Sequence, residues 1–352
     1  MKTIHRYVVP FVAAVICQSC PVLADSAAVD KLVQAGADAY EKGDYREAEK
    51  AFKASLTEAE KLGPTNDALC IPLNNLAIVY QEQSKFAEAE PLYRRILAIK
   101  QKNKGKENEE YATILENLGV LYYNWGKYTQ AESLLSEVLT LRQKIDGADS
   151  AAVAHTLGAL GAAYGGENRD VQEEVYLRKA LSIYEAKLPN SGELAECLHN
   201  LAAVIVRQKK RDEAEALFTR SLKIKEKVYP PGHPKMAATF ACLGQIYQEQ
   251  GKYKEAEAEI KMALEIRKTT LGVQNPDTAR TMSDLACLYL KEKNYKEAEP
   301  LFEQSCKVLR SHLGPDHSVL LWALQNYCDL LEQTGRKQKA APLRTEITQV
   351  GK

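Results

Sequence analysis

Two short phrases of small and apolar residues alternate along this chain. The first joins leucine to a small residue and usually has tyrosine three positions on, as in Leu118-Gly119 with Tyr122. The second places alanine between acidic or amide residues, with an aromatic or aliphatic residue four positions later, as at Ala89 and Tyr93. Spacings of three and four residues bring side chains to one face of a helix, so each phrase predicts an amphipathic helix.

Both phrases recur with a step of about 41 or 42 residues. The first is found at Leu76-Ala77, Leu118-Gly119, Leu160-Gly161, Leu243-Gly244 and Leu285-Ala286. The alanine of the second is found at Ala48, Ala89, Ala131, Ala214, Ala256 and Ala298. Self-similarity at this period is typical of stacked helical hairpins, because one hairpin alone cannot bury its apolar face. We therefore predict an all-α solenoid of about eight antiparallel helix pairs, and we name the helices of each pair helix A and helix B.

Short polar turns, such as Gly251-Lys252, separate helix A from helix B, and Gly/Pro linkers such as Gly232-His233-Pro234 separate the units. Two backbones can approach closely only where the side chains between them are small. We therefore expect small residues such as Gly244 where helix A crosses its own helix B. We expect small residues such as Ala256 where helix B meets the next unit. The predicted units are 29–69, 70–111, 112–153, 154–194, 195–236, 237–278, 279–320 and 321–350.

Two units depart from this pattern. The fourth lacks the usual turn phrase and has Glu173 where a small residue is expected. We interpret it as a locally loosened part of the stack, with a hinge as the alternative. The last unit has Tyr327-Cys328 in place of the leucine–small pair, and its closing segment from 337 to 350 is rich in polar residues. This composition suits a terminal cap with a solvated outer face.

The Leu-Gly-x-x-Tyr and Ala-x-x-x-Phe phrases resemble the tetratricopeptide repeat. The longer period, the Asn-Leu-Ala and Tyr-x-Glu-Ala-Glu phrases and the Gly/His/Pro linkers resemble the kinesin-light-chain branch of that family. The resemblance extends over residues 29–350 in eight copies. It implies a right-handed superhelix of antiparallel helix pairs, in which helix A lines an inner groove that holds peptides or protein segments.

An asparagine recurs on helix A directly before the leucine–small pair or its degenerate equivalent. It is found at Asn75, Asn117, Asn200 and Asn326. The position lies opposite the stripe that packs on helix B, and the family resemblance places it in the groove. An amide both donates and accepts hydrogen bonds, so it can pair with a peptide backbone of any sequence. We predict a ladder of contacts to an extended ligand; the alternative is that these amides bridge neighbouring helices of the scaffold.

Other side chains share the predicted groove face and carry charges of both signs. They predict a partner of mixed character, with Tyr123 and Trp322 as anchors because aromatic residues dominate interface energetics. The predicted groove residues besides the asparagines are Tyr123, Arg207, Gln245, Arg280 and Trp322, and the same face is expected to carry Glu116 and His199.

Charge argues against nucleic acid as the partner, because Lys+Arg and Asp+Glu both number 47. The basic run 207–211 falls at the turn of the fifth unit; we expect it to be exposed, with an anionic partner as the alternative. The carboxylates of the alanine phrase are expected on solvated helix faces beside Lys or Arg. His155 and His199 lack the Cys or carboxylate set that a metal site needs.

Enzyme signatures are missing: the sequence has no G-x-S-x-G, no H-E-x-x-H and no Gly-rich phosphate loop after a strand. We therefore predict a non-catalytic protein without cofactor or metal. Its predicted function is to capture a peptide or protein segment in the groove. The alternative is a structural envelope protein that assembles through its terminal repeats, and the oligomeric state stays open.

The N-terminal residues differ from everything after them. Basic residues precede an apolar run, and Val22-Leu23-Ala24 offers small side chains at the places that a signal peptidase recognises. We predict a signal peptide over residues 1–24 and export to the periplasm or outside the cell, because the run is too short to span a bilayer. A lipid anchor at Cys17 or Cys20 is the alternative.

Six cysteines follow the predicted signal peptide, without a C-x-x-C pair or zinc spacing. We expect them to be small buried apolar residues. Because export permits disulfides, a bond between Cys306 and Cys328 is the alternative.

Overall fold

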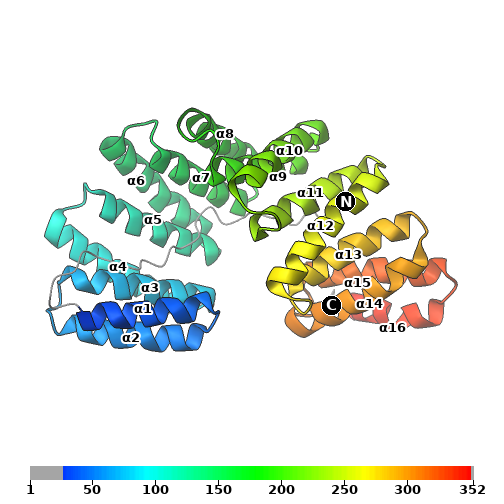
Figure 1. Ribbon diagram of the computed structural model, residues 1–352, viewed down its shortest axis with the longest axis horizontal. Coiled ribbons are helices and arrows are strands. Elements are labelled where there is room, and N and C mark those ends of the chain that lie inside the picture. Colours follow the sequence, from blue (N-terminus) through cyan, green and yellow to red (C-terminus); the bar gives the residue numbers. More distant parts are fainter. Residues whose placement is uncertain (1–26, 350–352) are drawn as a thin grey trace. The chain divides into compact units, whose positions relative to one another are not determined.

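The computed structural model describes residues 27–349, which form helices joined by short turns and contain no strand (Figure 1). The predicted signal peptide, with Cys17 and Cys20, lies outside the described residues. The described chain contains sixteen α-helices that pair into eight hairpins, so the predicted all-α solenoid of helix pairs is confirmed.

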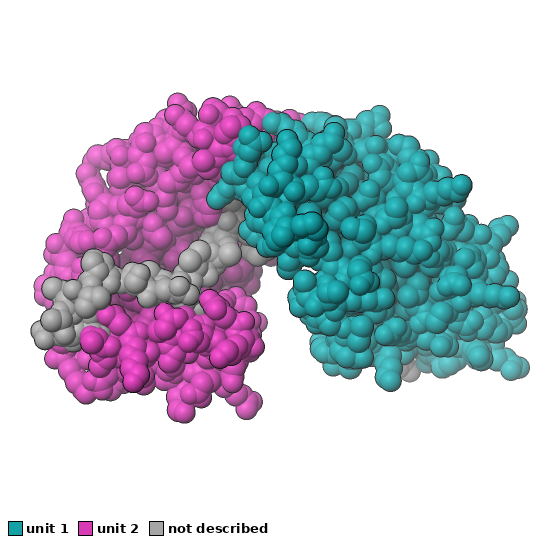
Figure 2. Space-filling model, viewed as in Figure 1, with its two compact units in different colours: residues 1–7, 190–352 teal, residues 8–189 magenta. Residues whose placement is uncertain are grey.

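The chain divides into two compact units (Figure 2). In the N-terminal unit, which ends at Pro189, the hairpins are α1 (Ala27–Glu41) with α2 (Tyr45–Glu60), α3 (Cys70–Glu82) with α4 (Phe86–Lys104), α5 (Glu109–Asn124) with α6 (Tyr128–Asp146), and α7 (Ala151–Gly166) with α8 (Asp170–Lys187). A short 3₁₀ helix, η2 (Asp67–Leu69), precedes α3. In the C-terminal unit, which starts at Asn190, they are α9 (Gly192–Arg207) with α10 (Arg211–Val228), α11 (Pro234–Glu249) with α12 (Tyr253–Leu271), α13 (Pro276–Lys291) with α14 (Tyr295–His312), and α15 (Ser318–Gln333) with α16 (Lys337–Gln349).

Each hairpin turns through one residue in the left-handed backbone region. These residues are Gly43, Ser84, Gly126, Asn168, Lys209, Gly251, Lys293 and Gly335, with φ between 57° and 78°. Glycine adopts this region without steric cost and occupies four of the eight turns, while Asn, Ser or Lys occupies the others. The fourth hairpin therefore keeps the turn, at Asn168, although its sequence lacks the usual turn phrase.

Glu173 replaces the usual small residue on α8, and α7 compensates for its size. The Glu173 side chain is buried, and a Cβ added to Gly165 would lie 2.3 Å from its Oε2 atom. A glycine on α7 therefore makes room for the carboxyl group on α8. The α7–α8 hairpin itself is packed; the loosened stack around it and the hinge stay predictions.

Polar side chains cap most A helices at a constant register. Asn108, Ser150, Ser191, His233, Asn275 and His317 each accept a hydrogen bond from a backbone N–H of the first turn that follows. Such caps satisfy donors that have no partner inside the helix. The predicted role of the linkers, to end one helix and cap the next, is confirmed.

Small residues lie where helix A crosses helix B. A Cβ on Gly119 would lie 2.9 Å from the Leu135 side chain, and one on Gly244 would lie 2.5 Å from Ile260 and 3.2 Å from the Ala256 carbonyl oxygen. The predicted crossings at both glycines are confirmed. The Ala256 carbonyl oxygen lies beside Gly244 of the same hairpin, and Ala256 also belongs to a buried cluster with residues of the next hairpin such as Ala279.

The cysteines are small buried residues, as predicted. The six cysteines of the described chain are free and buried, so Cys306 and Cys328 are not joined by a disulfide. Burial raises the pKa of the Cys306 thiol to about 12.

On α16 only Ala340 is fully buried among the described side chains, which leaves a polar outer face. Within residues 27–349, no helix has the length and apolar character that crossing a bilayer requires.

Candidate functional site

One position of helix A recurs in register with the predicted amide ladder. It is the residue directly before the leucine–small pair, and we call it the ladder position. In the described chain it is occupied by Asn75, Asn117, Ala159, Asn200, Cys242, Asp284 and Asn326, on α3, α5, α7, α9, α11, α13 and α15. Asp284 was missed by the sequence analysis, which selected asparagines only. A count of 42 residues back from Asn326 would have found it.

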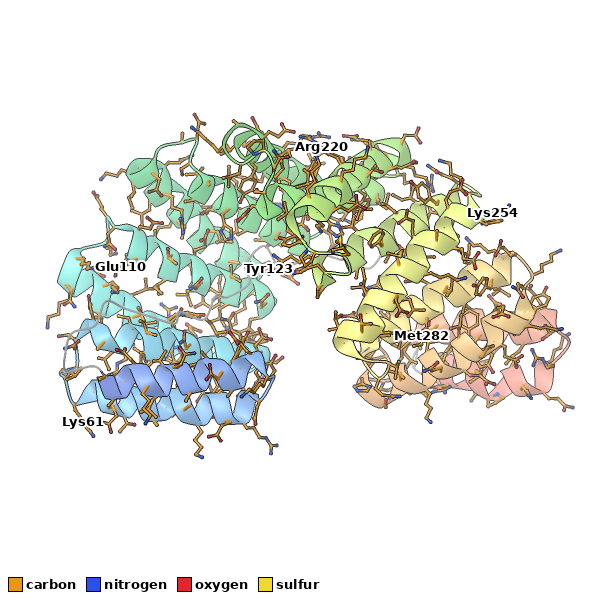
Figure 3. All side chains as sticks on the ribbon, in the orientation of Figure 1. Lys61, Glu110, Tyr123, Arg220, Lys254 and Met282 are labelled. Atoms are coloured by element: carbon orange, nitrogen blue, oxygen red, sulfur yellow. The ribbon has the colours of Figure 1, made fainter. Side chains whose placement is uncertain are left out.

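In the N-terminal unit two ladder amides, Asn75 and Asn117, bind the same neighbour, Asn74. Asn75 is fully buried and accepts a hydrogen bond from Asn74 Nδ2 at 3.3 Å. The partly buried Asn117 donates from Nδ2 to Asn74 Oδ1, also at 3.3 Å. These bonds connect α3 with α5, as the scaffold alternative expects. Tyr123, at the end of α5 (Figure 3), is partly buried and its ring lies 5.8 Å from that of Tyr128.

Glu116 was expected on the open groove face, but the structure places it in a buried ion pair. Its side chain is 4% exposed and accepts from Arg142 at 3.0 Å and Thr156 at 2.6 Å. His155 Nδ1 lies 3.2 Å from the same carboxylate. Burial acts to raise the pKa of Glu116, but His155 and Arg142 outweigh it and hold that pKa below its ordinary value. The expectation was wrong because Thr156 and His155 come from the next helix A, about 40 residues away.

His199 also lies inside the scaffold of the C-terminal unit. It is fully buried, its Nδ1 lies 3.0 Å from Thr239 Oγ1, and its ring packs edge-on against Phe218 at 5.1 Å. Thr239 also accepts a hydrogen bond from Lys225 Nζ at 3.1 Å. Lys225 is fully buried, and burial lowers its pKa although Glu196 acts in the opposite direction. The predicted groove position of His199 is therefore wrong.

Asn200 differs from the amides of the N-terminal unit. It is 4% exposed, and neither its Oδ1 nor its Nδ2 has a hydrogen-bond partner in the described chain. Glu196 lies one turn earlier on α9, and its Oε1 is also buried without a hydrogen-bond partner in the described chain. Its Oε2 lies 3.4 Å from Lys225 Nζ. Buried polar groups in folded proteins are nearly always hydrogen-bonded, so these atoms are unusual, although single atoms of Gln83, Gln250 and Glu259 share the property.

Asp284 holds the ladder position two hairpins further along. It is 5% exposed, and its Oδ1 accepts from Gln245 Nε2 at 3.2 Å, which connects α11 with α13. Its Oδ2 has no hydrogen-bond partner within residues 27–349. Burial raises the pKa of Asp284, while the charges of Arg280 and Arg267 act to lower it.

The remaining predicted residues are partly buried. Asn326 donates to the Trp322 backbone carbonyl of its own helix at 2.7 Å, and Trp322 packs against the core of the C-terminal unit. Arg207 ends α9. The predicted set thus divides between the units, with Asn75, Asn117 and Tyr123 in one and Asn200, Arg207, Gln245, Arg280, Trp322 and Asn326 in the other.

The second glutamate of the alanine phrase has a function that the sequence analysis missed. It accepts a hydrogen bond from the tyrosine of the next helix A, with Tyr122 to Glu90 at 2.8 Å and Tyr289 to Glu257 at 2.6 Å. The turn cation of the next hairpin also binds it in places, as in the ion pair of Lys85 with Glu49 at 3.2 Å. The interpretation of these carboxylates as solvated helix faces is therefore wrong for the second glutamate. The constant separation of 32 residues between glutamate and tyrosine was the available signal.

Buried cations at one register of helix B were also missed, because Lys and Arg on a helix usually indicate an exposed face. They are Lys100, Arg142, Lys225 and Arg267. Lys225 donates to the Lys235 carbonyl at 2.9 Å, and Arg267 donates to Thr281 on α13. These bonds connect helix B with the helix A that follows. The part of the chain that the structure describes has no group of three or more His, Cys, Asp or Glu able to hold a metal ion.

The sequence matches the family model of the Tetratricopeptide repeat over residues 28–102, 110–186, 193–269 and 235–311. The chain therefore belongs to the tetratricopeptide-repeat family. A comparison with curated proteins finds no match.

Solved structures show the same fold. BtubC (BKLC) from P. vanneervenii is 21% identical, with 71% of this chain and 94% of that chain covered and a TM-score of 0.52. A tetratricopeptide repeat protein from Parabacteroides merdae ATCC 43184 is 19% identical, with 85% and 98% covered and a TM-score of 0.53. A Rap protein complexed with Competence and Sporulation Factor is 15% identical, with 92% and 97% covered and a TM-score of 0.54. At these identities the similarity shows the fold alone.

Proposed function

We propose that this protein is a non-catalytic scaffold that captures a peptide or protein segment on the faces of its A helices. Membership of the tetratricopeptide-repeat family supports an interaction scaffold, because this fold generally serves that purpose. The proposed groove residues are Asn75, Asn117, Asn200, Asn326, Tyr123, Arg207, Gln245, Arg280 and Trp322.

The observation that carries this proposal is the state of Asn200. Both of its amide atoms are buried and lack a hydrogen-bond partner among the described residues, although an amide can donate and accept at the same time. A peptide backbone offers the complementary N–H and C=O groups. A surface that is already ordered before binding loses little conformational entropy when the ligand arrives, which favours capture.

The polar clusters of the described chain favour a scaffold over an enzyme. Glu116, the most completely bonded buried carboxylate, is occupied by Arg142, Thr156 and His155. A general acid or base must reach a substrate proton, and a carboxylate saturated by scaffold partners is not placed to do so. We propose that the chain has no catalytic activity.

We also propose that the protein is exported, on the basis of the signal-like residues 1–24. Mass spectrometry of the chain recovered from the cell envelope or the medium tests this, and we expect it to begin at Asp25. A chain that retains Met1 and stays in the cytoplasm would contradict export.

The capture function is tested with the immobilised mature chain and an envelope extract from the source cells. We expect the wild-type chain to retain a defined protein that is lost when Asn75, Asn117 and Asn200 are all changed to Ala. Helical circular dichroism of the triple variant must match the wild type, so that lost capture is not lost folding. Equal retention by both chains would show that the ladder position does not contact the partner.

A further inference from the structure

The last hairpin lacks the apolar anchor of the other B helices. Four positions after the central residue of the alanine phrase, which is Glu173 on α8, each of the seven preceding B helices has a large side chain that is at most 2% exposed. On α16 the same count from Ala340 reaches Arg344, whose side chain is 44% exposed. The helix therefore has a cation where the others have a buried anchor. The seven anchors are Phe52, Tyr93, Leu135, Leu177, Phe218, Ile260 and Phe302.

Two bidentate ion pairs connect α16 with α14 and α15 (Figure 1). Arg344 on α16 donates to both carboxylate oxygens of Glu332 on α15, at 2.6 and 2.9 Å. Arg310 on α14 donates in the same way to Glu346 on α16, at 2.9 and 2.7 Å. The four side chains are between 31% and 44% exposed, so these pairs are in contact with solvent.

The apolar contact of α16 is small. Among its described side chains only Ala340 is fully buried, while Leu343 and Ile347 are half-buried against the core of the C-terminal unit. The preceding B helix, α14, fully buries Phe302 and Leu309. Because the free energy gained by burial is roughly proportional to the apolar area removed from water, α16 gains less from burial than α14 does.

Attachment through exposed ion pairs depends on ionic strength. The attraction between exposed charges is screened over about 10 Å at 0.1 M salt and over about 3 Å at 1 M. A third half-exposed pair, Arg336 with Glu299, connects the turn before α16 to α14 and is subject to the same screening. Added salt therefore weakens the contacts that hold α16 more than it weakens the apolar contacts that hold the other B helices.

One buried thiol reports on the position of α16. Cys328 on α15 is fully buried, and its Sγ lies 3.8 Å from the Ala340 backbone carbonyl oxygen on α16. It occupies the helix A position that Gly244 occupies in the sixth hairpin, where a Cβ would lie 2.5 Å from the anchor Ile260. Cys328 is therefore covered by α16 itself. Cys242 lies on α11, which has a hairpin of the same unit on either side.

We infer that α16 is a strap held mainly by charge, which opens and closes while the other hairpins of the C-terminal unit stay folded. Rising ionic strength shifts it toward the open state. Opening uncovers Cys328 and the face of α15 around it, so ionic strength determines how much of this face is accessible. The inference concerns the last hairpin and does not depend on the proposed function.

The test is thiol labelling of the mature chain with N-ethylmaleimide, an uncharged reagent. Mass spectrometry of the quenched and digested chain gives the labelling rate of each cysteine, normalised to that of a short peptide with the same sequence. We expect Cys328 to react about tenfold or more faster than Cys242 at low salt. Between about 0.05 M and about 0.5 M NaCl, the Cys328 rate should rise by about fivefold or more, and the Cys242 rate should change by less than about twofold.

A double variant tests the ion pairs directly. Glu332→Gln combined with Glu346→Gln removes both carboxylate charges and keeps the side-chain size. At low salt we expect it to label Cys328 about fivefold or more faster than the wild type, with most of the salt dependence lost. The matched control is Glu60→Gln, which breaks the exposed pair with Arg95 in the N-terminal unit and should leave the Cys328 rate within about twofold. Circular dichroism before labelling shows whether each variant is folded.

Two outcomes would overturn the inference. A Cys328 rate equal to that of Cys242 at every salt concentration would show that α16 opens only when the unit unfolds. A Cys328 rate that is faster but insensitive to salt would show that charge does not hold α16. The wild-type salt series decides between these outcomes even where the double variant does not fold.

Discussion

Gly165 on α7 and Glu173 on α8 occupy the same space in the fourth hairpin, because a Cβ on the glycine would lie 2.3 Å from the glutamate Oε2. The Glu173 side chain is only 2% exposed, so a displaced carboxyl group would have to move within the core. In the other hairpins alanine usually occupies the position of Glu173. The glycine on one helix and the large residue on the other therefore form one compensated pair.

This pair predicts an unusual sensitivity to a single methyl group. Gly165→Ala is expected to destabilise the chain by about 1–3 kcal/mol through overpacking, measured by urea unfolding. The control is Gly161→Ala, where the new Cβ would meet its nearest atoms at 3.4 Å, an ordinary contact. That change is expected to be neutral or stabilising by up to about 1 kcal/mol, because alanine favours helix. Equal effects of the two variants would contradict the pairing.

The crossing of α11 and α12 gives a second prediction. Ala256 is fully buried and its carbonyl oxygen would lie 3.2 Å from a Cβ on Gly244. Ala256→Leu should overpack this crossing and lower the free energy of unfolding by about 1–3 kcal/mol. Ala258→Leu, two residues on and exposed, is the matched control and should change stability by less than about 0.5 kcal/mol. An unchanged melting midpoint for Ala256→Leu would mean that the register of α12 is wrong.

The buried Glu116–Arg142 pair gives a pH-dependent prediction. Interaction with His155 and Arg142 lowers the pKa of Glu116 in the folded state below its ordinary value of 4.5. Its contribution to stability is therefore present above that value and is lost as the pH falls through the lower folded pKa. Glu116→Gln leaves Arg142 buried without its counter-charge, which we expect to cost about 3–5 kcal/mol at pH 7. The difference from wild type should shrink on acidification below pH 4.5 in denaturant titrations. A difference that does not depend on pH would show that the carboxylate charge is not the stabilising element.

The polar outer face of α16 predicts that the chain does not grow by end-to-end stacking. Only Ala340 is fully buried there among the described side chains, and a growing stack would have to bury the polar residues around it. We expect light scattering of the mature chain to give a mass that is independent of concentration. A mass that rises steadily with concentration would favour the structural, self-assembling alternative.

Periodic local features of the fold were predictable from the sequence. Glycine against Ile260 or Leu135 at the crossings, and caps such as His233 and Asn275, act over one helix or one hairpin, so their spacing along the chain contains the information. The fourth hairpin departs from the consensus because its turn uses Asn168 and its crossing inverts the usual sizes through Gly165 and Glu173. Pattern matching with one consensus does not detect a compensated pair.

The candidate site was less predictable. Periodicity placed Asn75, Asn117 and Asn200 at one register, but it did not show that Asn74 would bind the amides of the first two while the third lacks a partner in the described chain. The search for asparagines also missed Asp284, because this position of helix A is defined by its place in the repeat and not by its residue type.

The sequence by itself determined the class of this protein: helical hairpins with a step of about 42 residues, their turns and their caps, because these depend on neighbours within one hairpin. Only the tertiary structure decided which polar side chains are satisfied. Glu116 finds Thr156 and His199 finds Thr239, each 40 residues away on another helix, whereas Asn200 finds no partner in the described chain. A repeat pattern assigns a residue to a face, but hydrogen bonds require atoms within about 3 Å, and that distance depends on how successive hairpins pack.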